Sequence, residues 1–271
     1  MNKSPLLSVV MPAYNEEQKV LNRSIVSILN QTFQDYEFII VLDNPQNYDA
    51  IALINDFKND DDRIKLIIND KNLGVAPTLN IGVNASFGDF IARQDADDES
   101  TSHRFEKQIK FLNSNPDINV LGTAMDYVDE HGKIIFCRKY QNRPDKFIRK
   151  YNPLGHPTLM IRKEIFEKFG YYSENEQFKF VEDYELWFRW YLSGVRFFNL
   201  DESLYKYYQN RTNIKSRNTK LQLRNTIKLK NKYRLDLKFR ISDYLRLFGE
   251  KILTLLPSGL ISWLFYKLSK I

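Results

Sequence analysis

The stretch NLGVAPTLNIGVNASFGDFIARQD, residues 72–95, carries the pattern that decides the fold. Its first part opens with a glycine and then repeats apolar residues at helical spacing, among them Val75, Leu79 and Val83. Its last part, residues 89–95, is a short apolar run of strand type that ends at an aspartate. We therefore expect a helix, then a buried strand, and then polar side chains where the strand ends.

The chain before this stretch repeats the same alternation of strand and helix. Apolar runs at 7–14, 36–43 and 63–70 are predicted strands, and the segments 16–29 and 49–60 between them are predicted helices. Near-continuous apolar strands separated by helices are typical of a parallel, doubly wound α/β sheet. Ligands of such sheets bind beyond the carboxyl ends of the strands, so we expect a site there.

The second half of the chain has a mixed pattern. We predict a helix at 102–113, a hairpin at 118–140, a strand and helix at 157–170, an aromatic-rich helix at 182–194 and extended chain at 195–209. A long helical stretch is expected at 212–240. The aliphatic segment 247–271 is expected to form two short pieces, because Pro257 and Gly259 interrupt it.

Composition excludes several classes of protein. The 271 residues are 43% hydrophobic and 27% charged, which indicates a globular chain with one sizeable core. A single cysteine, Cys137, excludes an intrachain disulfide framework and agrees with a reducing compartment. The first residues do not resemble a signal peptide, and we expect no standard membrane-spanning helix because no run of about 18 uncharged apolar residues occurs.

The net charge of +6 is unevenly distributed. Residues 200–271 contain sixteen Lys and Arg against five Asp and Glu, which leaves the first 199 residues with a net charge of −5. A basic tail indicates an anionic partner. A solvated helical face is the simplest alternative, and nucleic acid is not expected because no known binding motif occurs. A basic face opposite Leu, Ile, Trp and Phe makes 247–271 a candidate membrane-surface segment.

Four carboxylates lie within five positions at the end of the strand predicted at 89–95: Asp95, Asp97, Asp98 and Glu99. Carboxylate oxygens at a strand end suit a hard divalent cation such as Mg²⁺ or Mn²⁺. The alternative is a solvated acidic loop at the start of the next helix, where the macrodipole favours negative charge. The cluster alone does not separate these two interpretations.

Polar residues also end the first two predicted strands. Asp43 follows the second strand and can accept a hydrogen bond from the imide N–H of a pyrimidine base. Pro12, Tyr14 and Asn15 close the first strand, where a tyrosine can line a base or ribose pocket. The alternative is ordinary chain reversal, since Asn and Pro are common in turns.

A further acidic pair, Glu182 and Asp183, begins the aromatic-rich helix. Acidic residues are common at a helix start because they compensate the positive end of the helix dipole. A carboxylate that faces a cleft from that position can also take a proton from a hydroxyl group. Both interpretations remain open from the residues themselves.

Five segments together, in this order and spacing, resemble the inverting nucleotide-sugar glycosyltransferases of family 2, which have a GT-A fold. They are SVVMPAYNEE (8–17), QTFQDYEFIIVLDN (31–44), NLGVAPTLNIGVNASFGDFIARQDADD (72–98), GHPTLMIRKEIFEKFGYYSE (155–174) and EDYELWFRW (182–190). The resemblance extends to bacterial transferases of capsule, O-antigen and exopolysaccharide synthesis. It implies a Rossmann-like, mainly parallel sheet flanked by helices.

The resemblance also implies roles for individual residues. Asp43 matches a base-contacting aspartate, and Asp95 matches the first aspartate of the DxD motif, which lies against the ribose or donor sugar. Asp97 matches the second, which binds the Mn²⁺ or Mg²⁺ that bridges the diphosphate. Asp183, with Glu182 beside it, matches the catalytic base. The other positions implied to lie near the donor are Pro12, Tyr14, Asn15, Glu17, Ala96 and His156.

The same resemblance predicts the domain organisation. Residues 1–210 are expected to form the GT-A domain, with a nucleotide-sugar half at 1–100 and an acceptor half at 101–210. Residues 211–271 are expected to form a basic, amphipathic helical extension. If that extension binds the anionic inner face of the cell membrane, the protein is cytoplasmic and peripheral.

The implied reaction moves one sugar from a nucleotide-sugar, a UDP-sugar in the first instance, to an oligosaccharide or lipid-linked acceptor. The expected setting is cell-surface polysaccharide synthesis, including capsule or lipopolysaccharide. Two alternatives remain: a catalytically inactive nucleotide-sugar or polysaccharide-binding protein of the same fold, and a nucleotidyltransferase. We expect Asp183 to share one cleft with Asp95 if the first interpretation holds.

Overall fold

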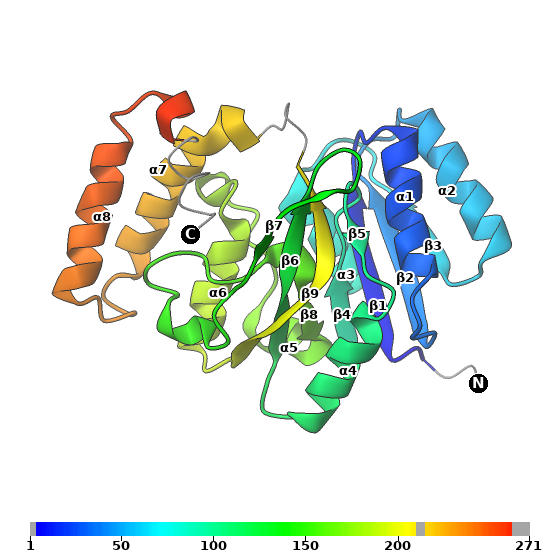
Figure 1. Cartoon of the computed structure of the whole chain (residues 1–271), viewed down its shortest axis with the longest axis horizontal. Coiled ribbons are helices and arrows are strands. Elements are labelled where there is room, and N and C mark those ends of the chain that lie inside the picture. The colour runs from blue at the N-terminus through cyan, green and yellow to red at the C-terminus, as the bar shows by residue number, and fades with distance from the viewer. Residues whose placement is uncertain (1–3, 210–214, 262–271) are drawn as a thin grey trace.

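The computed structural model describes residues 4–209 and 215–261. Within them, nine strands form one sheet, and helices cover both of its faces (Figure 1). The strands are β1 (Leu7–Ala13), β2 (Tyr36–Leu42), β3 (Ile64–Ile68), β4 (Phe90–Arg93), β5 (Glu99–Ser100), β6 (Val120–Val128), β7 (Ile134–Arg138), β8 (Met160–Arg162) and β9 (Phe197–Tyr208). The longer helices are α1 (Gln18–Leu29), α2 (Tyr48–Asp60), α3 (Val75–Asn84), α4 (Arg104–Ser114), α5 (Lys163–Phe169), α6 (Glu182–Leu192), α7 (Lys215–Tyr233) and α8 (Ile241–Leu253).

The strands lie in the order β3-β2-β1-β4-β8-β6-β9-β5, and β7 extends from β6. The first four are mutually parallel, and β6 is parallel to β9. The short β8 runs antiparallel to both of its neighbours and therefore joins the two parallel parts. This mixed, mainly parallel sheet confirms the predicted fold class, and the β6–β7 pair confirms the predicted hairpin.

Strand β1 shows why the predicted strands are almost continuously apolar. Successive side chains point to opposite faces of a sheet. Val9 and Met11 pack in the core under α1, α2 and α4, whereas Val10 packs in the core under α3, α5 and α6. Because both faces are covered by helices, every side chain of the strand must be apolar or, if it is polar, hydrogen-bonded.

The C-terminal helices differ from the prediction. The helix expected over 212–240 ends at Tyr233, Lys238 adopts a positive φ of 50°, and a new helix begins at Ile241. Asp243 causes the new start, because its Oδ2 accepts the backbone N–H of Arg240 at 2.9 Å. The piece expected from residue 247 is therefore the second half of α8. Helix α8 ends at Leu253 and the chain is helical again from Ser258, so the predicted interruption at Pro257 occurs. Residues 262–271 of that prediction lie outside the described residues.

Helix α7 packs on the body of the molecule. Leu229, Tyr233 and Leu237 belong to the same core as Trp187 and Trp190 of α6. Helix α8 packs on α7 and forms one end of the molecule, while α2 lies at the other end (Figure 1). Across the described residues, no helix is both long enough and apolar enough to span a bilayer.

Candidate active site

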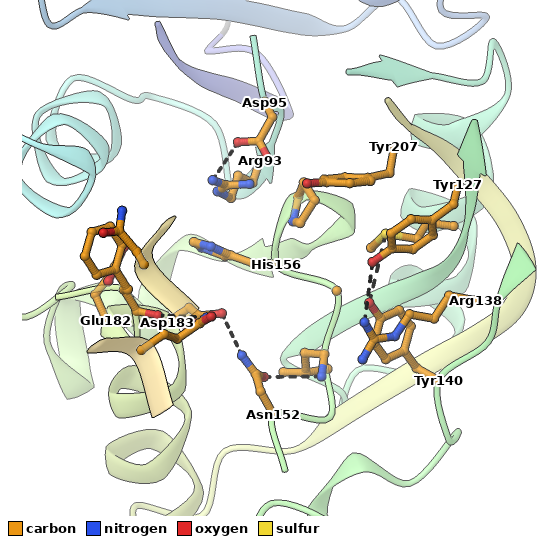
Figure 2. Close-up of a pocket in the computed structure, with 17 residues that line it drawn as sticks. Arg93, Asp95, Tyr127, Arg138, Tyr140, Asn152, His156, Glu182, Asp183 and Tyr207 are labelled. Carbon is orange, nitrogen blue, oxygen red and sulfur yellow. Dashed lines mark hydrogen bonds and ion pairs between the residues drawn. The ribbon is translucent and has the colours of Figure 1, made fainter. Parts of the chain in front are cut away.

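A cavity of about 450 Å³ lies beyond the carboxyl end of β4 (Figure 2). Its walls come from segments far apart in sequence. Arg93 enters from the last position of β4 and Asp95 from the loop that follows it. His156 enters from the turn before β8, and Glu182 and Asp183 from the start of α6. The structure thus brings together four of the residues that the sequence predicted: Asp95, His156, Glu182 and Asp183.

The acidic loop, residues 95–98, is held by donors beneath it. Gln94 is fully buried, and its Nε2 donates to the carbonyl oxygens at both ends of the loop, at 3.0 and 3.1 Å. Ser24 Oγ and Arg23 Nη2 of α1 donate to two of the loop carbonyls, each at 2.8 Å. These bonds fix the backbone of the loop from the side of α1.

The four carboxylates divide into two groups. Asp98 is fully buried, and its Oδ1 accepts the backbone N–H of Tyr208 at 2.8 Å. Glu99 accepts the Tyr208 hydroxyl at 2.6 Å and pairs with Arg23 and Lys206, both at 3.2 Å. Asp98 and Glu99 therefore fasten the loop to β9.

Ligand oxygens of Asp95, Asp97 and Asp98 lie within 4.8 Å of one another. Three carboxylates at that spacing repel one another unless a cation or proton lies between them. Oxygen-only donors at this spacing fit a hard divalent cation such as Mg²⁺ or Mn²⁺ and do not fit a thiolate-seeking metal. Asp97 is the ligand predicted from sequence, and Asp98 is an addition that the structure supplies.

Arg93 is a residue of the cavity that sequence reasoning missed. Its Nη2 lies 2.7 Å from Oδ1 of Asp95, and its side chain is only 9% exposed. Its Nε and Nη1 are buried without a hydrogen-bond partner in the described chain. The only available signal was an arginine within an apolar strand, two positions before an aspartate, where both side chains share a face.

His156 is half-buried and lies beside Arg93 in the cavity wall. Its Nε2 lies 2.8 Å from the hydroxyl of Tyr172, and its ring packs edge-on against Trp187. Burial lowers the pKa of His156 well below its usual value, and the charge of Arg93 lowers it further. The imidazole is therefore neutral near pH 7 and can exchange hydrogen bonds without adding charge to the cavity.

Glu182 and Asp183 begin α6 and face the cavity. Asp183 Oδ2 accepts the side-chain amide of Asn152 at 2.7 Å, and its Oδ1 accepts the backbone N–H of Tyr184 at 2.7 Å. Burial raises the pKa of Asp183. Burial, and then the charge of Asp183, raise the pKa of Glu182 to about 7. One carboxylate is thus held by two donors, while Glu182 Oε2 is buried and has none in the described chain.

The predicted base-contacting residue, Asp43, is buried and fully bonded. Its Oδ1 accepts from Asn69 Nδ2 at 2.7 Å and from the backbone of Leu73 at 2.8 Å, and its Oδ2 accepts from the backbone of Gly74 at 2.8 Å. Gly74 has a φ of 89°, which a glycine adopts without strain. Asp43 therefore fixes the loop that begins α3, and its contact with a base stays a prediction.

The other predicted donor contacts lie at the carboxyl end of β1. Tyr14 and Asn15 are exposed there, beside the turn that follows β2. Glu17 is exposed at the start of α1, whereas Glu16 is half-buried. Burial raises the pKa of Glu16, and the charges of Asp97 and Asp95 raise it further. Ala96 is buried, 2% exposed, within the acidic loop, and Pro12 is half-buried within β1.

Glu16 thus lies closer to the acidic loop than Glu17 does. No sequence signal distinguishes two adjacent acidic residues at a helix start. The structure also adds Tyr127, Arg138, Tyr140 and Asn152 to the cavity, none of which belongs to a predicted motif.

Comparison with known proteins agrees with this geometry. Residues 8–170 match the family described as Glycosyl transferase family 2. An uncharacterized glycosyltransferase of Methanocaldococcus jannaschii is 39% identical over 85% of this chain and 80% of its own length. The putative glycosyltransferase EpsE of Bacillus subtilis is 33% identical over 97% and 94%. The O-antigen biosynthesis glycosyltransferase WbnJ of Escherichia coli is 33% identical over 74% and 79%.

Two solved structures share the fold at low sequence identity. TarS of S. aureus, in complex with UDP-GlcNAc, is similar with a TM-score of 0.63 and 17% identity over 90% of this chain and 79% of that chain. Mannosyltransferase PcManGT of Pyrobaculum calidifontis, in complex with GDP-Man and Mn²⁺, is similar with a TM-score of 0.65 and 12% identity over 96% and 72%. The fold is the GT-A fold. From its matched segments and its relatives, the chain belongs to family 2 of the glycosyltransferases.

Proposed function

We propose that this protein is a metal-dependent, inverting glycosyltransferase that moves one hexosyl or N-acetylhexosaminyl group from a nucleotide-sugar to a carbohydrate acceptor. One observation supports this most strongly: Asp95, from the acidic loop, and Asp183, from the other half of the chain, line the same cavity. Inverting transfer needs a donor site and a base on opposite sides of one reacting carbon.

The residues of the cavity have separate tasks in this mechanism. Asp97, with Asp95 or Asp98, would hold Mn²⁺ or Mg²⁺. When bound, such an ion neutralises the charge that develops on the departing diphosphate. Asp95 and Arg93 orient the donor sugar. Asp183 takes the proton of the acceptor hydroxyl as that oxygen attacks the anomeric carbon from the face opposite the diphosphate.

The setting of the reaction is proposed from the relatives. One relative is named for O-antigen biosynthesis, which supports a role for this chain in cell-surface polysaccharide synthesis. Another is named for transfer to a diphosphoundecaprenol-linked sugar, which supports a lipid-linked acceptor. Solved neighbours hold UDP-GlcNAc and GDP-Man, so both nucleotide classes are candidates, and a UDP-sugar is our first choice. The binding-protein and nucleotidyltransferase alternatives remain outcomes of the test.

The test is a donor panel of UDP- and GDP-sugars assayed for nucleoside diphosphate release. We expect release with Mn²⁺ or Mg²⁺, loss on addition of EDTA, and strong reduction in Asp97→Asn. Donor binding without any release would favour the inactive binding protein. Formation of UTP or GTP from the nucleotide-sugar when pyrophosphate is added would indicate a nucleotidyltransferase. Full activity in EDTA would overturn the metal dependence.

We also propose that α8 rests on an anionic membrane at its inner, cytoplasmic face. Ile241, Leu245, Phe248 and Ile252 recur at helical spacing and are 80%, 67%, 64% and 49% exposed. The basic side chains near this stripe, also exposed, are Lys238, Arg240 and Lys251. An exposed apolar stripe with basic residues beside it is typical of helices that lie in a membrane interface.

Vesicle co-sedimentation tests the membrane contact. The full chain should pellet with vesicles that contain phosphatidylglycerol and remain in solution with phosphatidylcholine alone. Leu245→Asp with Phe248→Asp should abolish pelleting. Tyr48→Asp is the control, because Tyr48 is 74% exposed on α2 at the far end of the molecule. A chain that ignores anionic vesicles at low salt would contradict the proposal.

A further inference from the structure

The cavity contains a second arginine, Arg138, on the wall away from Asp183. In Figure 2, Tyr127, Arg138 and Tyr140 lie on one side of the cavity, and Glu182 and Asp183 lie on the other. Arg138 is the last residue of β7, the strand that extends the hairpin with β6. The hairpin therefore carries a fixed positive charge into the acceptor half of the site.

The two arginines of the cavity differ in their partners. Arg93 is neutralised by Asp95 at 2.7 Å. In the described part of the chain, no carboxylate oxygen lies within 4.0 Å of an Arg138 nitrogen; its Nη1 lies 3.4 Å from the hydroxyl of Tyr127. A guanidinium stays charged at any physiological pH and presents a planar fork of donors that matches two oxygens of one anion. Arg138 is therefore available to an anion that enters the cavity.

Aromatic rings surround this arginine. Its Cζ lies 5.0 Å from the ring centroid of Tyr140. The Tyr127 ring lies 4.8 Å from that of Tyr207 and stacks at 4.4 Å on Phe136. Tyrosine offers a flat apolar face and a polar hydroxyl. A sugar ring has C–H groups on its faces and hydroxyls on its rim, so this wall suits a sugar that carries a negative group.

We propose that Arg138, with Tyr127 and Tyr140, binds an oxyanion of the acceptor, either the phosphate that joins the acceptor sugar to its carrier or the carboxylate of an acidic sugar. This inference rests on the proposed function, because it takes Asp183 as the point where the acceptor hydroxyl lies. The donor occupies the side of Arg93 and Asp95. The rest of the acceptor must then extend along the wall that the hairpin forms.

The experiment compares three synthetic acceptors that have the same sugar-ring configuration and the same alkyl tail. In the first, a diphosphate joins sugar and tail; in the second, the sugar is a uronic acid; the third is neutral. We expect Arg138→Met to raise KM about 10- to 100-fold for whichever anionic acceptor the enzyme prefers, the effect of losing a hydrogen bond to a charged group. KM for the neutral acceptor should not change.

Lys139→Met is the matched control, because it removes the same charge from the next residue, which is exposed and does not line the cavity. Arg138→Lys should give an intermediate KM, because lysine keeps the charge but lacks the planar pair of donors of a guanidinium. It replaces Arg138→Met as the test variant if Arg138→Met does not fold. Preference for the diphosphate or for the uronic acid identifies the oxyanion. Equal KM changes on anionic and neutral acceptors, or equal effects of both Met variants, would overturn the inference.

Failure of the proposed function gives a different result. If no donor releases a nucleoside diphosphate, either with or without an acceptor, the transferase assignment itself is wrong. If release without acceptor is normal in Arg138→Met and only anionic-acceptor KM rises, donor binding is intact and the acceptor assignment holds. A rise in donor KM instead would place Arg138 on the donor and would contradict the inference.

Discussion

Arg93 and Asp95 form an ion pair at the carboxyl end of β4, with 2.7 Å between Nη2 and Oδ1. The two residues are two positions apart on extended chain, so their side chains share one face. The pair holds Asp95 at the cavity wall and offsets one of the charges of the acidic loop. Because Nε and Nη1 of Arg93 have no partner in the described chain, the guanidinium retains donors for a ligand.

Removing Arg93 should therefore destabilise the protein and weaken donor binding together. Arg93→Met leaves Asp95 unpaired in a largely buried position, and we expect about 2–3 kcal/mol less free energy of unfolding, below the range for a fully buried pair because Asp95 is 25% exposed. Urea unfolding measures this. The double variant Arg93→Met, Asp95→Asn should recover part of the loss. Unchanged stability in the single variant would show that the pair does not form.

Replacing the proposed base should separate chemistry from donor binding. Asp183→Asn keeps the shape of the side chain and removes its ability to take a proton. We expect kcat to fall about 10²- to 10⁴-fold, the usual contribution of a general base, while the Kd of the nucleotide-sugar stays within about twofold. Calorimetric titration with donor and a transfer assay measure the two quantities. Normal turnover of this variant would show that Asp183 is not the base.

Asn152 provides a graded test of the same assignment. Its side-chain amide donates to Asp183 Oδ2 at 2.7 Å, so it positions the base without reacting itself. Asn152→Ala should lower kcat by about tenfold, in line with the loss of a hydrogen bond to a charged group, and should leave donor KM unchanged. A rise in donor KM with unchanged kcat would place Asn152 on the donor instead.

The first half of the fold was predictable because its pattern is periodic. Strands β1 to β4 and helices α1 to α3 occur where continuous apolar runs and helical spacing placed them. The break between α7 and α8 was not predictable in the same way. It depends on the side chain of Asp243 accepting from the backbone of Arg240, and on Leu237 reaching the core of α6, which are tertiary contacts.

Part of the site was predictable for a different reason. Asp95 and Asp183 belong to segments with a recognisable order and spacing, and the structure places both in the cavity. Several other residues that line the cavity belong to no comparable sequence pattern. Nothing in the sequence distinguishes Arg138, which faces the cavity, from Lys139, which does not. Only the strand register of β7 against β6 decides which of the two side chains faces the cavity.

The attachment of α7 to α6 gives a prediction about stability. The hydroxyl of Tyr233 donates to Glu185 Oε1 at 2.7 Å in a buried setting, and Glu185 also pairs with Arg189 at 2.9 Å. Tyr233→Phe leaves that carboxylate with one donor fewer and should cost about 1–2 kcal/mol of unfolding free energy. Tyr244→Phe is the control. Tyr244 is 44% exposed on α8, and its loss of a hydroxyl should change stability by less than about 0.5 kcal/mol.

The raised pKa of Glu182 predicts a specific dependence of stability on pH. Burial and the charge of Asp183 raise that pKa from 4.5 to about 7 in the folded protein. The folded state therefore holds a proton that the unfolded state releases. The contribution of Glu182 to the free energy of unfolding is complete below about pH 4.5 and disappears as the pH rises through 7.

We expect Glu182→Gln to remove this dependence, because glutamine has no proton to lose and avoids the cost of a buried charge. The difference in unfolding free energy between Glu182→Gln and the natural chain should grow by up to about 3 kcal/mol in favour of the variant between pH 4.5 and 8. Glu176→Gln is the control, since the Glu176 side chain is 84% exposed. A constant difference across this pH range would show that Glu182 ionises in the folded protein as it does in water.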